Sequence, residues 1–294
     1  MQFSQLPKEK QAAIVADYQS GMGIKEIYTA HGCSQKGVYN ALRRSGVGVY
    51  RRKMSPAETK RVDDFLVSAR RAFPLPGLPP PSTRKQPIPF DQTAFDVVTP
   101  QAAYWAGLLM ADGCVTDERA IVIQLQERDR ELVDGLRWFL CSKHKQQRVL
   151  PRDSRHSPQI RMSIKSKRLA AVLAHYGIIP RKTFAARAPD FLAMHPDFWR
   201  GYLDGDGTFE VSNGTVSMVG TEALMAQFVE FNRAIFPNSM AMSDPHASTP
   251  GIRIGRVSGK SAQLFLRAIY TSPPWLDRKR RCAEAIASRH NRRL

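Results

Sequence analysis

The chain has 294 residues, 43% of them hydrophobic, and a formal net charge of +18. The length fits one medium domain and a small one. We find no signal peptide and no run near the roughly 18 apolar residues of a membrane span, so we expect an intracellular protein, cytoplasmic or nucleoid-associated. The four cysteines are too widely spaced for a zinc site. Lys and Arg occur in clusters, which favours nucleic acid as the partner.

Three short helices are predicted before residue 47, over residues 8–19, 24–30 and 35–44, with Ser34 capping the third. Two short helices joined by a turn with Gly resemble the homeodomain-like helix-turn-helix of resolvases, whose last helix enters the major groove. Its inner face would hold Val38, Ala41 and Leu42. We therefore expect a DNA-binding domain over residues 1–48; a small three-helix bundle without DNA contact is the alternative. The candidate DNA contacts are Gln35, Lys36, Asn40 and Arg43.

Residues 49–95 are predicted to form a basic, Pro-rich linker. Arg51, Arg52 and Lys53 open it and are candidates for contact with the DNA backbone. Residues 56–71 could form one amphipathic helix, and residues 73–90 are rich in Pro, which favours an extended, semi-rigid segment outside any core. Such a tether would raise the effective concentration of one DNA-binding module beside the other.

From Thr99 the pattern of helices and strands runs through once and then repeats, which predicts one unit over residues 96–195 and a second over 196–294. Each unit contains a similar motif. The first reads Trp-Ala-Gly-Leu-Leu-Met-Ala-Asp-Gly and ends at Gly113; the second reads Trp-Arg-Gly-Tyr-Leu-Asp-Gly-Asp-Gly and ends at Gly207. Each motif would form a helix with an Asp at its end, Asp112 in the first and Asp206 in the second.

Small residues stand one helical turn apart in each motif, Gly107 and Ala111 in the first and Gly201 and Gly205 in the second. Such spacing lets two helix backbones approach closely. If the two helices pack side by side, their ends bring the two Asp carboxylates together. Converged carboxylates repel one another unless cations lie between them, and hard divalent metals suit such oxygen ligands.

The two motifs, on a basic chain with matching repeats, resemble the LAGLIDADG homing endonucleases in their single-chain, two-repeat form. The resemblance covers about residues 96–290 and implies an α+β fold of two tandem αββαββα repeats related by a pseudo-two-fold axis, preceded here by the all-α helix-turn-helix domain. It implies that Asp112 and Asp206 bind Mg²⁺, for which Mn²⁺ may substitute, with Ala111 and Gly205 beside them as further metal ligands. Met110 and Asp204 take the sixth motif position, where we expect Asp204 to face solvent or to cap locally.

The resemblance also implies that the two sheets form a saddle along the major groove of double-stranded DNA. Strand residues alternate between faces, so one set would contact bases. A basic residue near the active site is expected in each half: Lys165 in the first, with Arg256 and Lys260 competing in the second. The Arg-Lys pairs that end the halves would contact the DNA backbone, mainly through Lys182 and Lys279. The strand candidates for DNA contact are Gln124, Gln126, Arg161, Ser217, Arg253 and Arg256.

The predicted function is that of a site-specific homing endonuclease, a monomer that hydrolyses both strands of a long, pseudo-palindromic target and leaves staggered ends. Intron homing, from a gene inside an intron or between genes, would be its biological setting. A DNA-binding transcriptional regulator that has lost cleavage, or an RNA intron maturase of the same fold, is the alternative.

Overall fold

A computed structural model describes residues 7–20, 22, 24–45, 56–151, 153, 157–246 and 249–289. The chain divides into two compact units, Met1–Thr59 and Lys60–Leu294. Arg51, Arg52 and Lys53, the basic residues predicted to follow the DNA backbone, lie outside the described residues. No helix in the described part of the chain is long and apolar enough to cross a membrane.

The first unit contains the three predicted helices, α1 (Lys8–Gln19), α2 (Ile24–Ala30) and α3 (Gln35–Arg44). They bury a small core of Ile14, Ile27, Val38, Ala41 and Leu42. The inner face predicted for the third helix is confirmed, because Val38, Ala41 and Leu42 are all at most 1% exposed. The Ser34 hydroxyl accepts a hydrogen bond from the Gly37 amide, which caps α3 as expected.

The segment after α4 (Pro56–Ala69) is attached to the second unit along much of its length. Strand β1 (Phe73–Pro74) pairs with β2 (Val97–Val98), and buried Arg168 donates hydrogen bonds to the carbonyls of Pro79 and Gln92. The prediction that the Pro-rich stretch lies outside the core is wrong at Leu75 and Phe90, which are at most 9% exposed. The amphipathic helix is confirmed, with Val62 and Leu66 buried.

The second unit consists of two halves with the same order of elements. The first half contains α5 (Pro100–Ala111), β3 (Gly113–Val115), β4 (Ala120–Gln126), α6 (Arg130–Phe139), β5 (Gln147–Val149), β6 (Gln159–Lys165) and α7 (Lys167–His175). The second contains α9 (Pro196–Asp206), β7 (Gly207–Glu210), β8 (Thr215–Thr221), α10 (Glu222–Ile235), β9 (Met242–Pro245), β10 (Ile252–Ser258) and α11 (Gly259–Ile269). Between the halves lie η2 (Lys182–Phe184) and α8 (Asp190–Ala193), and α12 (Asp277–Ala287) follows the second.

The two αββαββα repeats are therefore present, and the fold class is α+β as predicted. Each half has one antiparallel sheet of four strands, in the orders β3-β4-β6-β5 and β7-β8-β10-β9. Alternate residues of each central strand are buried beneath helices: Ile121, Ile123 and Leu125 in β4, for example, and Val216 and Met218 in β8. The other residues of these strands occupy an open face on each sheet.

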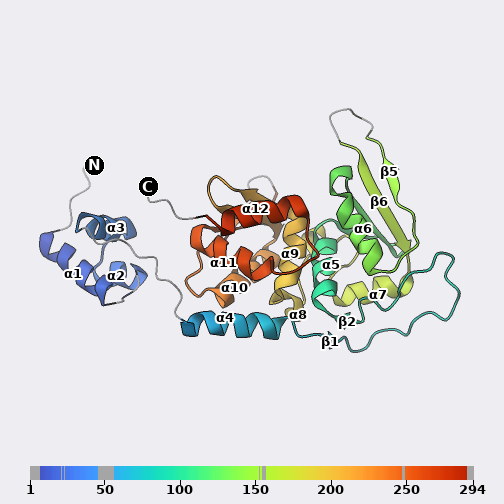
Figure 1. Ribbon diagram of the computed structural model, residues 1–294, viewed down its shortest axis with the longest axis horizontal. Helices are drawn as coiled ribbons and strands as arrows, with labels where there is room; N and C mark the ends of the chain where they lie inside the picture. The colour runs from blue at the N-terminus through green and yellow to red at the C-terminus, as the bar shows by residue number, and fades with distance from the viewer. Residues whose placement is uncertain are drawn as a thin grey trace. The chain divides into compact units, whose positions relative to one another are not determined.

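Helices α5 and α9 lie side by side at the junction of the two halves (Figure 1). Their approach is close because two glycines face the opposite backbone. A Cβ on Gly107 would lie 2.0 Å from the carbonyl oxygen of Phe198, and one on Gly201 would lie 1.9 Å from that of Tyr104. No larger residue fits at either position without moving a helix. Thr99 caps the start of α5, where Pro100 supplies the first helical residue.

Candidate active site at the ends of the paired helices

The ends of α5 and α9 bring the two motif carboxylates together. Asp112 is the C-cap of α5, and Asp206 is the last residue of α9. A Cβ on Gly205 would lie 2.4 Å from Ala111 Cβ and 2.8 Å from Asp112 Oδ2, so the Asp112 carboxylate rests against the residue that precedes Asp206. The small residue at each helix end thus permits the convergence that the spacing of the motifs predicted.

The electrostatics of this pair are those of crowded carboxylates. Loss of water, followed by repulsion from Asp206, raises the pKa of Asp112 to about 6. Loss of water also raises the pKa of Asp206, while Lys279 and Lys182 oppose the increase. Removal of the charge from one of the two groups is therefore less costly than for an ordinary surface Asp, unless a cation binds between them.

Two lysines are the cations nearest to this pair. Lys182 donates a hydrogen bond to the Gly113 carbonyl at 2.6 Å, and Lys279 donates to the carbonyls of Leu203 at 3.0 Å and Gly205 at 2.6 Å. Burial lowers the pKa of both, that of Lys279 to about 8, against the favourable influence of nearby acidic groups that include Asp112 and Asp206.

Their placement differs from the predicted contact with DNA phosphates. Lys279 is only 5% exposed and Lys182 is half-buried. The sequence singled out Lys182 and Lys279 only by their place, because each follows an Arg in a pair that closes its half.

The basic residues predicted near the active site are Lys165 in the first half and Arg256 or Lys260 in the second. Lys165 is exposed at the end of β6, where its ammonium lies 3.4 Å from Glu118 Oε2. The strand register pairs Ala120 with Lys165 and Thr215 with Ser258, so neither Arg256 nor Lys260 occupies the corresponding position in the second sheet. Lys260 belongs to the first turn of α11. A catalytic role for Lys165 or Lys260 stays a prediction.

The expectation that Asp204 faces solvent is wrong. Its side chain is 2% exposed and accepts hydrogen bonds from the Tyr104 hydroxyl at 2.8 Å, the Tyr270 hydroxyl at 2.6 Å and the Leu276 amide at 2.8 Å. Burial raises its pKa to about 6, although these donors oppose the change. Because Leu276 precedes Lys279 by one helical turn, Asp204 fixes the segment that brings the Lys279 ammonium to the end of α9.

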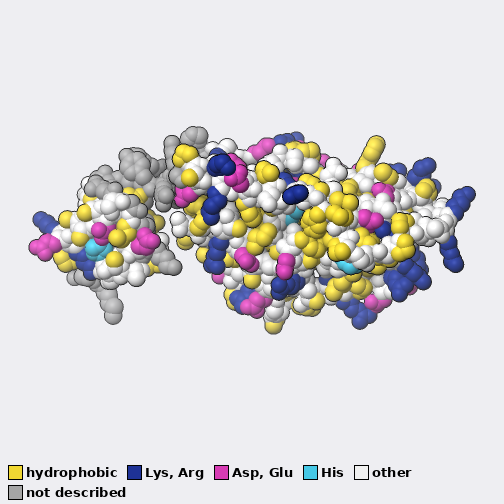
Figure 2. Space-filling model, turned by 90° about the horizontal axis from the view of Figure 1, so that it is seen from below, with side chains coloured by type: hydrophobic (Ala, Val, Ile, Leu, Met, Phe, Trp, Pro, Cys, Tyr) yellow, Lys and Arg dark blue, Asp and Glu magenta, His cyan; other side chains and the backbone are white. Residues whose placement is uncertain are grey.

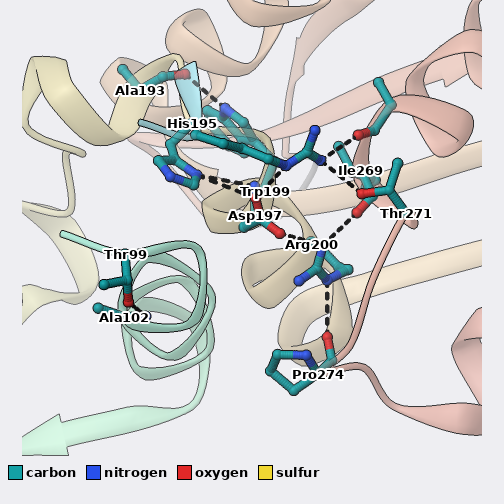
Figure 3. Close-up of polar contacts among 12 residues, drawn as sticks. Thr99, Ala102, Ala193, His195, Asp197, Trp199, Arg200, Ile269, Thr271 and Pro274 are labelled. Atoms are coloured by element: carbon teal, nitrogen blue, oxygen red, sulfur yellow. Dashed lines mark hydrogen bonds and ion pairs between the residues drawn. The ribbon is translucent and has the colours of Figure 1, made fainter. Parts of the chain in front are cut away.

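The other end of α9 is anchored by a buried cluster (Figure 3). Asp197 is fully buried and forms ion pairs with Arg70 at 2.8 Å and with Arg200 at 2.5 Å. His195 caps the helix by accepting the Asp197 amide proton, and burial lowers its pKa to about 4. Arg200 also donates hydrogen bonds to the carbonyls of Ile269 and Pro274. Both ends of α9 are thereby fixed against neighbouring segments.

The open faces of the sheets contain most of the strand residues predicted to contact DNA. Gln124, Gln126 and Arg161 lie on the open face of the first sheet, and Ser217 and Arg256 lie on that of the second, where the register pairs them directly. Arg253 does not share that face: it pairs with Gly220, whose Cβ would meet the helix residues Met225 and Leu224, and it forms an ion pair with Glu222. Arg253, predicted to contact DNA from a strand, therefore lies on the opposite face of β10 from Arg256, one residue out of register with the open face.

The N-terminal candidates lie on α3. Gln35 and Lys36 are exposed and Asn40 is half-buried, while the side chain of Arg43 lies outside the described residues. Contact of this helix with DNA stays a prediction.

No family model matches the chain, and no curated protein matches it. Among solved structures it is similar to full-length DUF199/WhiA from Thermatoga maritima, with 17% identity and a TM-score of 0.43 over 67% of this chain and 64% of that one. It is similar to the N-terminal LAGLIDADG domain of DUF199/WhiA, with 16% identity and a TM-score of 0.40 over 76% and 96% of the two chains. It is also similar to the homing endonuclease I-WcaI bound to its DNA recognition sequence, with 10% identity and a TM-score of 0.48 over 70% and 95%.

The chain itself shows the two motifs, the two αββαββα repeats and the glycine contacts between the motif helices. This is the α+β fold that the resemblance to LAGLIDADG proteins implies. The chain spans 64% of the full-length WhiA structure.

A metal ion at the ends of α5 and α9 would be held by few side chains. No group of three or more His, Cys, Asp and Glu in the described part of the chain could hold a metal ion. The candidate ligands are instead two carboxylates and main-chain carbonyls, which is a donor set that suits Mg²⁺. In the second half the Gly205 carbonyl, a predicted metal ligand, already accepts a hydrogen bond from the Lys279 ammonium.

Proposed function

We propose that the chain is a site-specific DNA endonuclease in which Asp112 and Asp206 are the essential acidic groups. The observation that supports it is the convergence of these carboxylates at the ends of the closely packed helices α5 and α9, with raised pKa values that a divalent cation would reverse. The two open sheet faces and the charge of +18 fit a duplex as the substrate.

The two carboxylates fit Mg²⁺, with the Ala111 carbonyl as a further ligand. Mg²⁺ bound there would polarise a phosphoryl oxygen and favour ionisation of water, which is the chemistry of metal-dependent phosphodiester hydrolysis. The chain itself supplies the position of the carboxylates and the positive charge of Lys182 and Lys279 beside them. These ammonium groups would stabilise negative charge on the phosphate as its bond to oxygen breaks.

The test requires a target, which selection from a pool of randomised duplexes can provide. The protein would be bound to the pool without divalent ions, the retained sequences cloned into a plasmid, and cleavage followed with Mg²⁺ and with Mn²⁺. Asp112→Asn and Asp206→Asn should retain binding, and each should lose cutting. Asp190→Asn, at a carboxylate whose side chain is 96% exposed, is the matched control and should cut like the unmodified protein. Unchanged cutting by both motif variants would refute the proposal.

One observation favours a second function, that of a DNA-binding regulator without cleavage. The Lys279 ammonium lies 2.6 Å from the Gly205 carbonyl, where it competes with a metal ion for that oxygen. A regulator would bind its selected sequence and leave the plasmid intact with either ion. Lys279→Met separates the two roles of this lysine: cutting should fall if the ammonium stabilises charge on the phosphate, and should rise or first appear if the ammonium keeps a metal ion from the Gly205 carbonyl.

A further inference from the structure

We propose that the two halves read DNA by different chemistry. At the open-face positions level with the paired carboxylates, the first sheet reads base edges through hydrogen bonds, whereas the second sheet reads the methyl groups of thymine through apolar side chains. The open-face pair of Ser217 and Arg256, further along the second sheet, is outside this contrast. The inner part of the half-site beneath the second sheet is therefore rich in A·T pairs. This inference rests on the proposed binding of duplex DNA, but it does not require cleavage.

Equivalent positions in the two sheets follow from the strand register. Gly113 and Gly207 both follow a motif Asp directly, and they pair with Ile123 and Met218 in the neighbouring strands. Those residues pair in turn with Met162 and Gly255. Counting one residue further along each strand places Gln124 opposite Arg161 in the first sheet and Val219 opposite Ile254 in the second.

The open face of the first sheet is polar at these positions. Arg161 is paired with Gln124 on one side and with Gln147 on the other, and all three side chains are at least partly exposed. Two residues further on, Gln126 pairs with Gln159, and Gln124 donates a hydrogen bond to the Gln159 side chain. Gln can bond to both N6 and N7 of adenine, and Arg to both O6 and N7 of guanine.

The second sheet is apolar at the same positions. Val219 and Ile254 replace the Gln and the Arg, and Ile252 replaces Gln159, while Asp244 takes the place of Gln147. Val219 is 39% exposed, and nearby Met242 on the edge strand is 45% exposed. Val219, Ile254, Ile252 and Met242 can neither donate to nor accept from a base edge, and the thymine methyl is the apolar group that the major groove offers. Asp244, on the edge strand, is the one polar residue among these positions. Basic side chains are not confined to the sheets: Figure 2, seen from the side of α4, shows Lys and Arg toward the end of the second unit that contains the first half.

The contrast concerns base pairs close to the paired carboxylates. Gln124 and Val219 each follow the residue that pairs with the glycine after a motif Asp. One strand residue spans about 3.3 Å, which is close to the rise of one base pair, so these positions lie over the inner part of each half-site.

Substitution of thymine by deoxyuridine in the selected duplex tests the inference directly, because it removes the methyl and leaves every hydrogen-bonding group in place. Deoxyuridine in the inner part of the second half-site should weaken binding roughly fourfold for each methyl that is contacted. The same change in the first half-site should have little effect. Gln124→Ala identifies the first half-site, because it should relax the base preference on that side alone.

An exchange of chemistry between the halves provides the second test. The double variant Val219→Gln and Ile254→Arg should abolish the effect of deoxyuridine and shift the preference of the second half-site toward adenine and guanine. Val67→Gln, at a residue of α4 that is 73% exposed, is the control and should leave both preferences unchanged. If selection yields a target but deoxyuridine in its second half-site leaves binding unchanged, this inference is wrong while the proposed function stands. A pool without any enriched sequence would overturn the proposed function as well.

Discussion

Gly201→Ala tests the helix contact on which the paired carboxylates depend, and the sign of its effect is informative. In an isolated helix, Ala is more stable than Gly by about 1 kcal/mol, so this change would ordinarily stabilise the protein. Here the new methyl would lie 1.9 Å from the Tyr104 carbonyl oxygen and 2.9 Å from the Leu108 nitrogen, and both are backbone atoms. The helices must therefore move apart by more than about 1 Å, because a carbon and an oxygen that are not bonded stay beyond about 3 Å.

Overpacking of this kind costs about 1–3 kcal/mol, and backbone neighbours on both sides place this site at the upper end of that range. After the gain in helix propensity, we expect the free energy of unfolding to fall by about 2 kcal/mol, measured by urea denaturation with the slope held in common. Gly107→Ala should behave alike, since its methyl would lie 2.0 Å from the Phe198 carbonyl oxygen.

Gly135→Ala is the matched control for this experiment. Gly135 also lies within a helix, but its Cβ would meet only the indole ring of Trp105, at 2.7 Å, and no backbone atom. The loss should be smaller there, because a side chain can move more readily than a paired helix. A Gly201→Ala protein as stable as the unmodified chain would refute the close packing of α5 against α9, and with it the convergence of the two carboxylates.

Two further predictions concern buried polar groups beside the same helix. Asp204→Ala should lower the free energy of unfolding by about 3–5 kcal/mol, because it leaves the buried hydroxyls of Tyr104 and Tyr270 without their acceptor. Thermal unfolding measures this loss. A loss below about 1 kcal/mol would contradict the hydrogen bonds of Asp204 to the two tyrosines. The pKa of His195 is about 4 in the folded protein, against an ordinary value of 6.5. As the pH decreases below 6.5 the unfolded chain therefore binds the proton first. The free energy of unfolding falls between pH 6.5 and pH 4, by up to about 3 kcal/mol. His195→Gln should lack this component in urea denaturation at pH 7 and pH 4.5, and parallel losses in the two proteins would refute it.

Periodic patterns in the sequence were sufficient for most of the fold. The limits of the helices and the alternation of β4 and β6 follow from the spacing of apolar residues, which is a local property. The face of Arg253 depends instead on the register between β8 and β10, which short-range periodicity does not determine. The limits of the short strand β3 did not follow from periodicity, because its three residues are too few to show any period; only the resemblance implied a strand there.

Long-range contacts determine the features of the site that the sequence did not predict. The surroundings of Asp204 come from Tyr104, Tyr270 and Leu276, three segments far apart in the chain. A motif shared by both halves gives no indication of these partners, because the first half has Met110 at the corresponding position. The docking of the Pro-rich segment likewise depends on Arg168, whose position in the first turn of a later helix carries no signal of such a contact.

The difference between Met110 and Asp204 has a consequence for how each half positions its lysine. In the second half, the Asp204 carboxylate holds the Leu276 amide, and Lys279 follows one turn later in the first turn of α12. In the first half, Lys182 follows Arg181, whose φ of 54° turns the chain and whose guanidinium pairs with Asp117 at the surface. Lys279 is therefore fixed by a buried network and Lys182 by an exposed turn. The Lys182 ammonium donates to one main-chain carbonyl and the Lys279 ammonium to two, so the two strands of a bound duplex would meet differently supported charges.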